Sequence, residues 1–584
     1  MRPMPTHVRR HRRWLGLIGL TLLTLALTDG PSAVTARAQE SAVTISIVGT
    51  TDLHGRIFPD DARGGLALLG GYLANLRAAR AAGDGAVLLL DSGDTYQGAI
   101  ESNLSEGAVV IDAYNALGYT AAAIGNHDLE FGAVDVWNPR QEASPDTRGA
   151  LKARAAQAHF PFLAANLHEH GAPVTWPNVA PSVIVDAAGV KVGLIGVMTY
   201  DALSMTLAAN VVGLRVTDLA EAIGAEATRV RAAGATLVVV AAHAGGDCAA
   251  LDQPADLSSC DDTAEMFDVV RRLPRGLVDV VMAGHTHAAV AHGVNGVAIV
   301  QAYSWGRAFS RVDVTVDRAD GRAAGVRIFA PQPVCAREDP RGQCAAAGTA
   351  AHYEGRPVVA DAAVEAAMAP ALARVQALRA TPLGVELAAT VPRGAGDSES
   401  ALGNLFADAF RAHLPGTDVG LSYASGPGGL RADISAGPAT LGGLYDVYPF
   451  DNRVVRRTLT GAELKQLLAG RATRPRFGGR ALGVSGLRVR LSCRDGVFQA
   501  EANHETGEPI GDGEHFVVAM SDFLAARAIT IAPAAAAPHA GEPSSQMRDV
   551  VSSWLRGHGG RMDAGQFADP ARPRWTQPAV CGSI

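Results

Sequence analysis

The chain has 584 residues, of which 48% are hydrophobic, 19% are charged and 5% are aromatic, and its formal net charge at pH 7 is −7. A chain of this length is too long for one hydrophobic core, so we expect two domains. The composition is that of an ordinary globular protein, and the small negative charge gives no reason to expect a surface for nucleic acid or for anionic membranes.

The first 38 residues have the pattern of a signal peptide. Four arginines between positions 9 and 13 are followed by an apolar stretch at 14–27, which is too short to span a bilayer comfortably. Residues 36–38 then offer a small-x-small cleavage site. A retained membrane anchor is the alternative, and the paired arginines leave the twin-arginine export route open. We expect a periplasmic or secreted protein with no stable membrane anchor after cleavage.

From Val43 to roughly Val316, apolar runs with strand character alternate with helical stretches, which predicts an α/β sandwich. Five of the apolar runs are each followed by a short polar cluster, and the runs are Ile45–Val48, Val87–Leu90, Ala121–Ile124, Leu237–Ala241 and Val278–Met282. The clusters, in the same order, are Asp52-Leu53-His54, Gly93-Asp94, Gly125-Asn126-His127-Asp128, His243 and Gly284-His285-Thr286-His287. Because the carboxyl ends of parallel strands lie along one edge of a sheet, we expect the clusters to converge there.

The five clusters combine carboxylate, imidazole and amide groups. In Asp52-x-His54 and His285-x-His287, the i, i+2 spacing directs both side chains the same way in extended backbone. Such a dense set of ligands suits two divalent metals better than one. Taken singly, an aspartate after a strand is often a helix cap and a lone histidine is usually a satisfied polar residue. Five such clusters at strand ends are hard to explain in that way.

Helical spacing predicts four helices in the first half of the chain, at 65–82, 109–117, 218–233 and 263–273. Residues 182–185 and 190–196 read as a hairpin, so the sheet should be mixed. Residues 318–350 are expected to be loop-rich. The Ala-rich stretch 358–380 predicts a helix that connects two domains.

The second domain is expected to mix helices and strands from about Leu383 to the end of the chain. The pattern predicts helices at 400–412 and 460–469, and strands at 454–459, 487–492 and 515–520. The Ala/Pro/Gly/Ser-rich stretch 531–545 is expected to be an exposed loop.

Six cysteines, an even number in an exported chain, suggest disulfides. Among the many connectivities, we prefer the two short loops Cys248–Cys260 and Cys335–Cys344, which leaves Cys493–Cys581. The alternative is that some of the cysteines are buried free thiols. The Cys-x2-Cys spacing of a structural zinc site is absent.

The segments TDLHG, DSGD and GNHD, the lone His243 and the segment GHTH resemble, in this order, the metal motifs of the 5'-nucleotidase family of calcineurin-like metallophosphoesterases. That family includes UDP-sugar hydrolases and 2',3'-cyclic-nucleotide phosphodiesterases. The resemblance implies an N-terminal four-layer α/β/β/α metallophosphoesterase sandwich with mixed sheets and a C-terminal α+β substrate-binding domain. It divides the chain into a signal peptide (1–38), a metallophosphoesterase domain (39–350), a linker helix (351–382) and a 5'-nucleotidase C-terminal domain (383–584).

The resemblance also assigns ligands for two divalent metal ions. One ion would be bound by Asp52, His54 and His287, the other by Asn126, His243 and His285, and the Asp94 carboxylate would bridge them. Mixed nitrogen and oxygen ligation suits Zn²⁺ or Mn²⁺ and does not exclude Fe or Co. Some family members have an amide in place of His287, which could change the metal preference.

His127 is implied to be the catalytic residue that binds no metal. As an imidazolium it would stabilise charge on the phosphoryl oxygens or on the leaving group. The family places an orienting carboxylate three residues later, which is Glu130 here, while many members have Asp at that position. Asp128 is a competing candidate, and a charge at a helix N-terminus is the ordinary structural alternative for both.

The C-terminal motifs imply a nucleoside clamp. The matching segments are Leu402–Ala409, Ser425–Arg431, Tyr448–Asn452, Gly483–Arg488 and Ser521–Ala525. Phe450 and Phe523 would sandwich the base, within a motif that also contains Asn452, while Arg431 and Arg393 would bind phosphate. On residue type alone, ordinary core residues are the better reading of the two phenylalanines.

This chain departs from the family pattern after Phe523. The family continues to a Gly-Gly-Asp-Gly stretch whose aspartate helps to hold the nucleoside, whereas the matching residues here are Arg527-Ala528-Ile529-Thr530. The glycine-rich loop before Arg431 also contains Pro427 as an apparent insertion. The sequence therefore supports phosphoester hydrolysis better than nucleoside selectivity.

We expect an exported two-metal phosphoesterase that hydrolyses small-molecule nucleotides, with no nucleic-acid polymer as partner. Candidate substrates are nucleoside 5'-monophosphates, 2',3'-cyclic nucleotides and nucleotide sugars. One alternative is thiosulfohydrolase chemistry on the same scaffold, in which the two phenylalanines would have no obvious purpose. Another is an exported nucleotide-binding protein that has lost catalysis, yet every expected ligand and His127 are present.

Overall fold

The computed structural model describes residues 42–60, 63–134, 146–319, 321–394, 398–424, 429–450, 452–471, 481–495, 497–531 and 545–577. The predicted signal peptide lies outside these ranges, as does the predicted loop 531–545 except for its two end residues. Within the described ranges, no helix is both long enough and apolar enough to span a bilayer.

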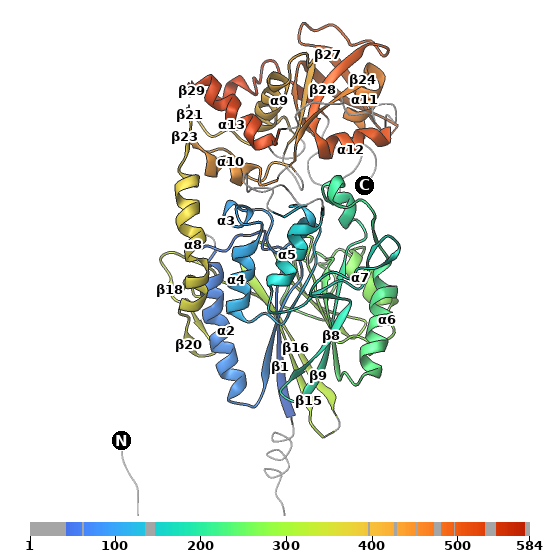
Figure 1. Ribbon diagram of the computed structural model, residues 1–584, viewed down its shortest axis with the longest axis vertical. Helices are drawn as coiled ribbons and strands as arrows, with labels where there is room; N and C mark the ends of the chain where they lie inside the picture. The colour runs from blue at the N-terminus through green and yellow to red at the C-terminus, as the bar shows by residue number, and fades with distance from the viewer. Residues whose placement is uncertain are drawn as a thin grey trace, which may run out of the picture. The chain divides into compact units, whose positions relative to one another are not determined.

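Two mixed sheets form the centre of the N-terminal half (Figure 1). The first has the strand order β16 (Arg322–Pro333), β15 (Ala308–Asp317), β1 (Ala42–Thr50), β2 (Ala86–Asp91), β3 (Ala121–Ala123), β4 (Phe162–Leu163) and β7 (Val179–Ala180). The second has the order β13 (Ala289–Val294), β14 (Val297–Ala302), β12 (Val280–Met282), β11 (Leu237–His243), β9 (Val190–Met198) and β8 (Ser182–Ala187). Strands β1, β2 and β3 pair in parallel in the first sheet, and β9, β11, β12 and β14 do so in the second.

The strands of both sheets are apolar on both faces because each sheet is covered on both sides. Side chains such as Ile45 and Val239 are fully buried in one core cluster shared by the two sheets. Helices α2 (Gly65–Ala81), α4 (Ala108–Leu117) and α5 (Gly149–Gln157) contribute to a core on the first sheet, and α6 (Leu219–Ala232) and α7 (Glu265–Arg272) to a core on the second. The result is the α/β/β/α arrangement, with the four predicted helices and the β8–β9 hairpin in place.

Two expectations from the sequence are wrong. The five polar clusters do not follow strands of one sheet, because β1, β2 and β3 belong to the first sheet and β11 and β12 to the second. Strands that are buried on both faces have no polar side to show which of them pair. The segment expected to be loop-rich contains the twelve-residue strand β16. Most of β16 is exposed and its sequence does not alternate, so backbone pairing with β15 defines it.

Helix α8 (Ala362–Arg379) leads from the N-terminal half to the C-terminal half, within the stretch predicted to be helical. The helix begins after Asp361, whose side chain accepts hydrogen bonds from the backbone N–H groups of Ala363 and Val364. At its last residue, Arg379 pairs with Glu101 at 3.0 Å and with Asp446 at 2.6 Å. Both ion pairs therefore hold this helix end between segments that are far apart in sequence.

The C-terminal half mixes short sheets and helices. Its four-stranded sheet has the order β24 (Val454–Thr460), β28 (His515–Ser521), β22 (Val419–Tyr423) and β25 (Leu482–Ser485). Two three-stranded sheets contain β23 (Gly437–Thr440), β21 (Pro382–Leu387) and β29 (Gly560–Met562), and β27 (Val497–His504), β26 (Leu487–Arg494) and β30 (Trp575–Thr576). The helices are α9 (Ala401–His413), α10 (Leu441–Val447), α11 (Gly461–Arg471), α12 (Asp522–Ile531) and α13 (Met547–His558). The two helices and three strands predicted for this half are confirmed.

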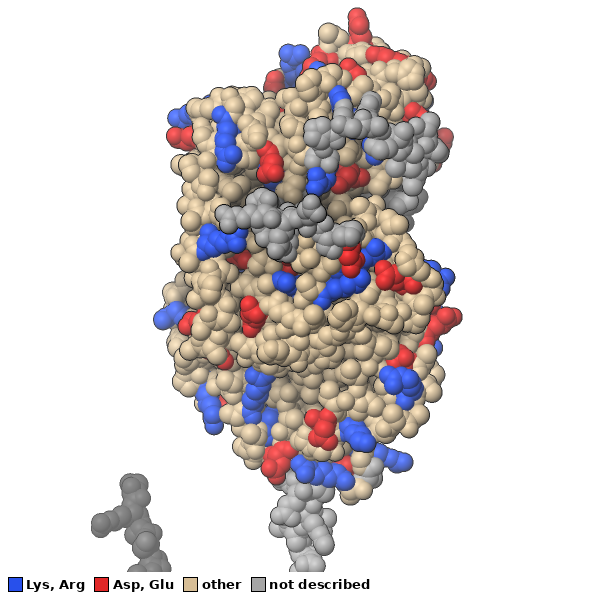
Figure 2. Space-filling model, in the orientation of Figure 1, with Lys and Arg blue, Asp and Glu red and all other residues tan. Residues whose placement is uncertain are grey.

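Charged side chains of both signs are interspersed on the face drawn in Figure 2, and no broad area of that face carries one sign. Asp313 on β15 is a charged residue that is buried. Its carboxylate accepts hydrogen bonds from Ser46 at 2.6 Å, Arg80 at 3.0 Å and Arg311 at 2.6 and 2.8 Å. Burial raises the pKa of Asp313, but the hydrogen bonds from Arg311 and Ser46 outweigh burial and bring the pKa below 3.8.

Replacing Asp313 with asparagine is expected to lower the melting temperature at neutral pH, since a hydrogen bond to a charged group contributes about 1.5–3 kcal/mol. The pKa of Asp313 is depressed in the folded state, so its contribution is present above 3.8 and is lost as pH falls through the folded value. Thermal melts of the wild type and of Asp313→Asn should therefore differ at pH 7 and converge in acid. A gap in melting temperature that stays constant down to acidic pH would exclude the carboxylate as its source.

Candidate metal centre

The predicted metal ligands lie on loops that leave strands of both sheets. Asp52 and His54 follow β1, Asp94 follows β2 and Asn126 follows β3. In the second sheet His243 is the last residue of β11, while His285 and His287 follow β12. Five of them are buried with at most 4% of their surface exposed, namely Asp52, His54, Asp94, Asn126 and His243. The structure thus brings all seven predicted ligands to adjoining ends of two sheets.

The seven side chains form two adjoining groups. In the first, Asp52, His54 and His287 place one potential ligand atom each within 4.8 Å of one another. In the second, Asp94, His243 and His285 do the same. Asn126 joins the second group, because its Oδ1 atom lies 3.0 Å from His243 Nε2.

Asp94 lies between the two groups. Its Oδ2 atom is 3.3 Å from His243 Nε2 and 3.7 Å from His54 Nε2. Its Oδ1 atom accepts a hydrogen bond from the backbone N–H of His127 at 2.8 Å. The carboxylate is therefore fixed with one oxygen between two imidazoles that belong to different groups.

The hydrogen bonds of the histidines show what the two groups can bind. His54 Nδ1 lies 2.9 Å from the carbonyl oxygen of Gln97, and His243 Nδ1 lies 2.8 Å from that of Ser92. A carbonyl accepts only, so each Nδ1 carries the proton and each Nε2 of a neutral ring offers a lone pair. Those lone pairs face the carboxylate oxygen of Asp94. Nitrogen and oxygen atoms that point lone pairs at each other repel unless a cation lies between them. This set of ligand atoms therefore fits divalent metal ions.

The pKa values of the histidines in the two groups shift in different directions. Burial lowers the pKa of His54 well below 6.5, and burial and the charge of His243 lower the pKa of His285 to about 4. Burial also lowers the pKa of His243, but the Asp94 carboxylate outweighs it and raises the pKa to about 10. Asp94 therefore stabilises a positive charge at His243 in the absence of metal, and a metal ion bound there would take the place of the Nε2 proton.

Backbone strain is concentrated at the same place. Non-glycine residues rarely adopt positive φ angles, yet Asp52, His54, Asp94, His285 and His287 have φ between 50° and 74°. Such strain persists only where the surrounding structure enforces it, and it is commonly found at functional sites.

Asp128, the competing candidate for orienting His127, has a different role. Its carboxylate accepts hydrogen bonds from the backbone N–H groups of Asp94, Thr95 and Gly125 at 2.8 to 3.1 Å. Asp128 thus holds the loop that carries Asp94. The position of Glu130 fits the predicted role of orienting His127, since its Oε1 atom is 3.6 Å from His127 Nδ1.

The His127 ring lies beside the first group of ligands. Its centre is 5.1 Å from that of His54, and the Phe450 ring stacks on it at 5.5 Å with an interplanar angle of 28°. His127 is 8% exposed. The predicted catalytic imidazole is therefore buried between a predicted metal ligand and a predicted base-binding ring.

The predicted substrate residues are only partly brought together. The Arg431 guanidinium lies 5.1 Å from the centre of the Phe450 ring, and both residues line a space of about 10 Å³ above His54. Arg393 donates a hydrogen bond to the backbone carbonyl of Arg431. Asn452 is held within the protein, accepting from the Tyr448 hydroxyl and donating to Asp522, both at 2.8 Å.

Phe523 is in a different cluster from Phe450. Its ring packs 5.9 Å from that of Tyr423, against the core of the four-stranded sheet, whereas Phe450 belongs to the core beneath α9 and α13. The two rings therefore pack against different core clusters in this structure.

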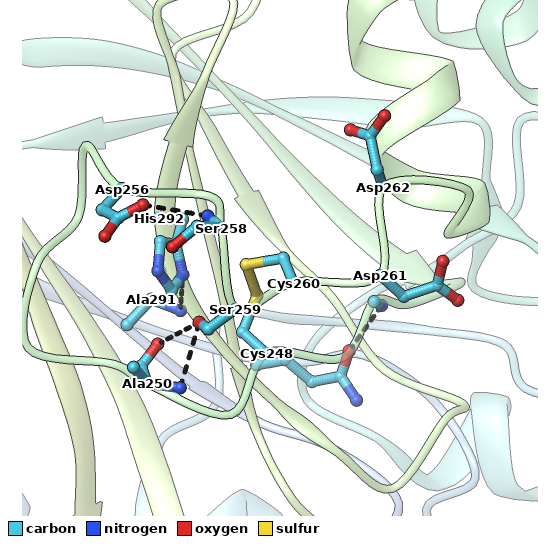
Figure 3. Close-up of a disulfide and its surroundings, with 12 residues drawn as sticks. Cys248, Ala250, Asp256, Ser258, Ser259, Cys260, Asp261, Asp262, Ala291 and His292 are labelled. Carbon is cyan, nitrogen blue, oxygen red and sulfur yellow. Dashed lines mark hydrogen bonds between the residues drawn. A yellow bond between two sulfur atoms is a disulfide. The ribbon is translucent and has the colours of Figure 1, made fainter.

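A disulfide fixes the loop that follows His243. Cys248 and Cys260 are bonded, and the backbone N–H of Cys248 donates to the carbonyl of Ala289 at 3.1 Å. Figure 3 shows the disulfide beside His292, with Ser259 bridging back to Ala250. The predicted pairs Cys248–Cys260 and Cys335–Cys344 are confirmed. Cys493 is also disulfide-bonded, and its predicted partner Cys581 lies outside the described residues.

Sequence reasoning missed residues that link the metal centre to the C-terminal half. The Gln97 carbonyl faces His54, and the Gln97 side chain donates to the carbonyl of Pro449 at 3.0 Å, next to Phe450. Asn103 donates to the same carbonyl at 2.8 Å. Backbone acceptors of this kind leave no signal in a side-chain pattern. Arg56 and Trp305, which also line the space above His54, were missed as well.

Comparisons with known proteins agree with the geometry. Residues 382–533 match the model of the 5'-nucleotidase C-terminal domain. The chain is 24% identical over 550 residues to cell wall protein Lmo0130 of Listeria monocytogenes, covering 86% of this chain and 66% of that protein, just under two thirds of its length. It is 24% identical over 518 residues to a 5'-nucleotidase of Vibrio cholerae, covering 82% of this chain and 85% of the relative.

Solved structures show the same fold. A 5'-nucleotidase precursor from Thermus thermophilus superposes with a TM-score of 0.67 at 24% identity, covering 88% of this chain and 97% of that one. The sulfate thiohydrolase SoxB of the same organism superposes with a TM-score of 0.65 at 18% identity, covering 92% and 98%. The chain is therefore a relative of the 5'-nucleotidases that has their two-domain fold and carries their C-terminal domain at residues 382–533.

Proposed function

We propose that the protein is an exported metal-dependent phosphoesterase that hydrolyses small nucleotides. The observation that carries the proposal is the convergence of two ligand groups on Asp94, whose carboxylate oxygen faces the Nε2 atoms of His54 and His243. The similarity to 5'-nucleotidases supports nucleotides as the substrate class. The two disulfides fit an oxidising compartment, which supports export of the residues after position 38.

The proposed metal ligands are Asp52, His54 and His287 for one ion and Asn126, His243 and His285 for the other, bridged by Asp94. Bound divalent ions would polarise the phosphoryl oxygens and supply hydroxide as the nucleophile. Zn²⁺ and Mn²⁺ both suit this mixture of imidazole and carboxylate ligands.

The chain's own residues then handle charge and orientation. His127 would stabilise the phosphoryl oxygens or protonate the leaving oxygen, and Glu130, 3.6 Å away, would hold the imidazolium. Arg431 adds a guanidinium fork suited to phosphate. The Phe450 ring, stacked on His127, excludes water from the imidazole. The proposed division of labour places catalysis before residue 350 and recognition of the nucleoside after residue 383.

A nucleotide cannot occupy the site in this conformation. The space bounded by His54, Arg431 and Phe450 is about 10 Å³, which suffices for one water molecule. Substrate entry therefore requires Phe450 to leave His127. The hydrogen bonds from Gln97 and Asn103 to Pro449 and the ion pairs of Arg379 are the contacts that such a hinge motion must break.

Phosphate release from a substrate panel tests the proposal. Purified protein with added Mn²⁺ or Zn²⁺ should hydrolyse at least one of AMP, 2',3'-cyclic AMP and UDP-glucose, together with bis-p-nitrophenyl phosphate. Hydrolysis of the aryl ester alone would support phosphoesterase activity but exclude nucleotides as the substrates. Turnover of a thiosulfonate with none of the phosphoesters would favour thiosulfohydrolase chemistry. Binding of nucleotides without any turnover would indicate a nucleotide-binding protein that has lost catalysis.

The clamp is tested by the double variant Phe450→Ala with Phe523→Ala. Loss of stacking on a base costs about 1–3 kcal/mol per ring, so kcat/KM for nucleotides should fall at least about tenfold. Bis-p-nitrophenyl phosphate has no nucleoside and serves as the matched control, because its hydrolysis should change much less. An equal loss of kcat/KM on both substrates would indicate that the rings are ordinary core residues. No loss on either substrate would show that the rings take no part in recognition of the nucleoside.

A further inference from the structure

Among the described residues, one further group of side chains outside the candidate metal centre has the composition of a metal site. Cys248, Cys260 and His292 each place one potential ligand atom within 4.8 Å of the others, and we call these three residues the Cys248 group. The two cysteines form a disulfide, and the His292 ring lies beside it (Figure 3). The histidine comes from strand β13 and not from the loop of the cysteines, so no short sequence spacing marks the group.

The Cys248 group lies in the protein interior. His292 is 1% exposed within β13, and Cys248 is 5% exposed. Burial lowers the pKa of His292 below 6.5, although the backbone and the charge of Asp256 oppose this shift. The imidazole is therefore neutral at pH 7, and one of its nitrogens has a lone pair.

Backbone hydrogen bonds position the two cysteines in addition to the bond between their sulfur atoms. The backbone N–H of Cys248 donates to the carbonyl of Ala289 on β13 at 3.1 Å. The backbone N–H of Ala249 donates to the carbonyl of Ser259 at 3.0 Å, which joins the two ends of the loop between the cysteines. If the S–S bond breaks, we therefore expect both sulfur atoms to stay close to each other and to His292.

The ligand types of the Cys248 group select a thiophilic cation. Two thiolates and one imidazole are typical ligands of Zn²⁺, whereas Mg²⁺ and Ca²⁺ prefer oxygen. Ligand atoms on one tetrahedral Zn²⁺ ion lie about 3.5–3.8 Å apart, because the Zn–S distance is about 2.3 Å and the Zn–N distance about 2.0–2.1 Å. The three atoms already lie within 4.8 Å of one another, so binding requires only small shifts of the side chains once the S–S bond is broken.

We propose that Cys248, Cys260 and His292 form a second metal site, which binds one Zn²⁺ ion after a dithiol has reduced the disulfide. The dithiol supplies two electrons and two protons, so that the S–S bond becomes two thiols and the dithiol itself becomes a disulfide. Zn²⁺ then displaces both thiol protons to the solvent and forms two Zn–S bonds and one Zn–N bond. Water completes the tetrahedral coordination.

In the reduced protein, the Zn²⁺ ion takes over the cross-link that the disulfide provides. Cys248 comes five residues after His243, and His292 comes five residues after His287. The loop that follows one candidate ligand of the metal centre therefore stays closed in both redox states, and in the reduced state it is also tied to β13. This inference does not depend on the proposed hydrolysis, because the seven candidate ligands of the metal centre include no cysteine.

Alkylation of the thiols in the wild-type protein tests the site without any substitution. The protein is reduced with dithiothreitol, freed of the reductant without air, and treated with iodoacetamide with and without Zn²⁺, and peptide mass spectrometry then identifies the alkylated cysteines. Zn²⁺ should slow alkylation of Cys248 and Cys260 at least about tenfold, because a metal-bound thiolate is not free to attack. Cys335 and Cys344 are the internal control, since among the described residues they belong to no such group. Equal rates with and without Zn²⁺, or equal protection of both pairs, would overturn the proposal.

A titration with Co²⁺ in place of Zn²⁺ tests the third ligand. Thiolates bound to Co²⁺ give a charge-transfer absorption band, which separates the Cys248 group from the metal centre. The reduced wild type should show this band and the oxidised protein should not. His292→Gln should raise the Kd read from the band by at least about 10–100-fold, which is what loss of an outer hydrogen bond alone costs in metal affinity. His413→Gln, at the end of α9, is the matched control and should leave the Kd unchanged. An unchanged Kd in His292→Gln, or a band of equal strength in the oxidised protein, would overturn the proposal.

Discussion

Replacing Asp94 with alanine is expected to abolish phosphoester hydrolysis and to lower the metal content of the protein. One oxygen of this carboxylate lies 3.3 Å from His243 Nε2 and 3.7 Å from His54 Nε2, so a single side chain serves both proposed metal positions. Removing it leaves the imidazole lone pairs without the shared anion that holds two cations close together. We expect kcat to fall by roughly 10⁴-fold or more, as when one member of a catalytic unit is deleted.

Elemental analysis and kinetics with bis-p-nitrophenyl phosphate measure the two effects of Asp94→Ala separately. Asp313→Ala is the matched control, because it removes a buried carboxylate whose partners are Ser46, Arg80 and Arg311 rather than a proposed ligand. Below its melting temperature the control should retain its metal and its activity. Two metal ions per chain in Asp94→Ala would refute the bridging role.

Replacing His127 with alanine should lower kcat by roughly 10²–10⁴-fold, the usual contribution of a positioned acid, and leave the metal content intact. The imidazole lies next to His54 but belongs to neither ligand group, and its Nδ1 atom faces Glu130. Loss of charge stabilisation at the phosphoryl oxygens should thus appear in kcat and not in metal affinity.

Glu130→Gln provides the comparison for His127→Ala. Loss of a residue that only positions the imidazole should lower kcat less than loss of the imidazole itself. The kcat of Glu130→Gln should therefore lie between the values of the wild type and of His127→Ala. The double variant should be no slower than His127→Ala alone, since the carboxylate acts through the ring. A wild-type kcat in His127→Ala would remove the imidazole from the mechanism, and additive losses in the double variant would give Glu130 an independent role.

The positions of the metal ligands could be predicted because their signal is local. Each cluster follows an apolar run and can be recognised without any tertiary contact. The extended backbone expected for Asp52-x-His54 and His285-x-His287 is wrong, because all four residues have positive φ angles. Short cysteine spacings likewise predicted the Cys248–Cys260 pair. Features of this kind depend on residues that are close in sequence.

What could not be predicted depends on contacts between distant segments. Strands buried on both faces carry no mark of their partners, so the two sheets were implied by the family resemblance and not by the apolar pattern. The carbonyl of Gln97, which sets the tautomer of His54, is a backbone group that any residue could offer. Arg56 was recognised as a residue of the space above His54 only when Trp305, far along the chain, was found beneath its guanidinium.

Phe450 illustrates a site residue whose conformation the sequence does not determine. The motif around it predicts a ring that stacks on a base, whereas the structure stacks it on His127. Both arrangements bury the same aromatic surface against a flat partner. Exchange of the imidazole face for a base face would keep the ring stacked on a flat partner, and it requires the contacts of Pro449 with Gln97 and Asn103 to break.

The two ligand groups are proposed to bind metal ions that are needed to hydrolyse nucleotides. The most direct measurement is a titration of chelator-stripped protein with Mn²⁺ or Zn²⁺, following phosphate release from nucleotides and the bound metal per chain together. We expect no release without metal and full activity once two equivalents are bound. Undiminished release by the stripped protein, or saturation of activity with a single equivalent, would contradict the proposal.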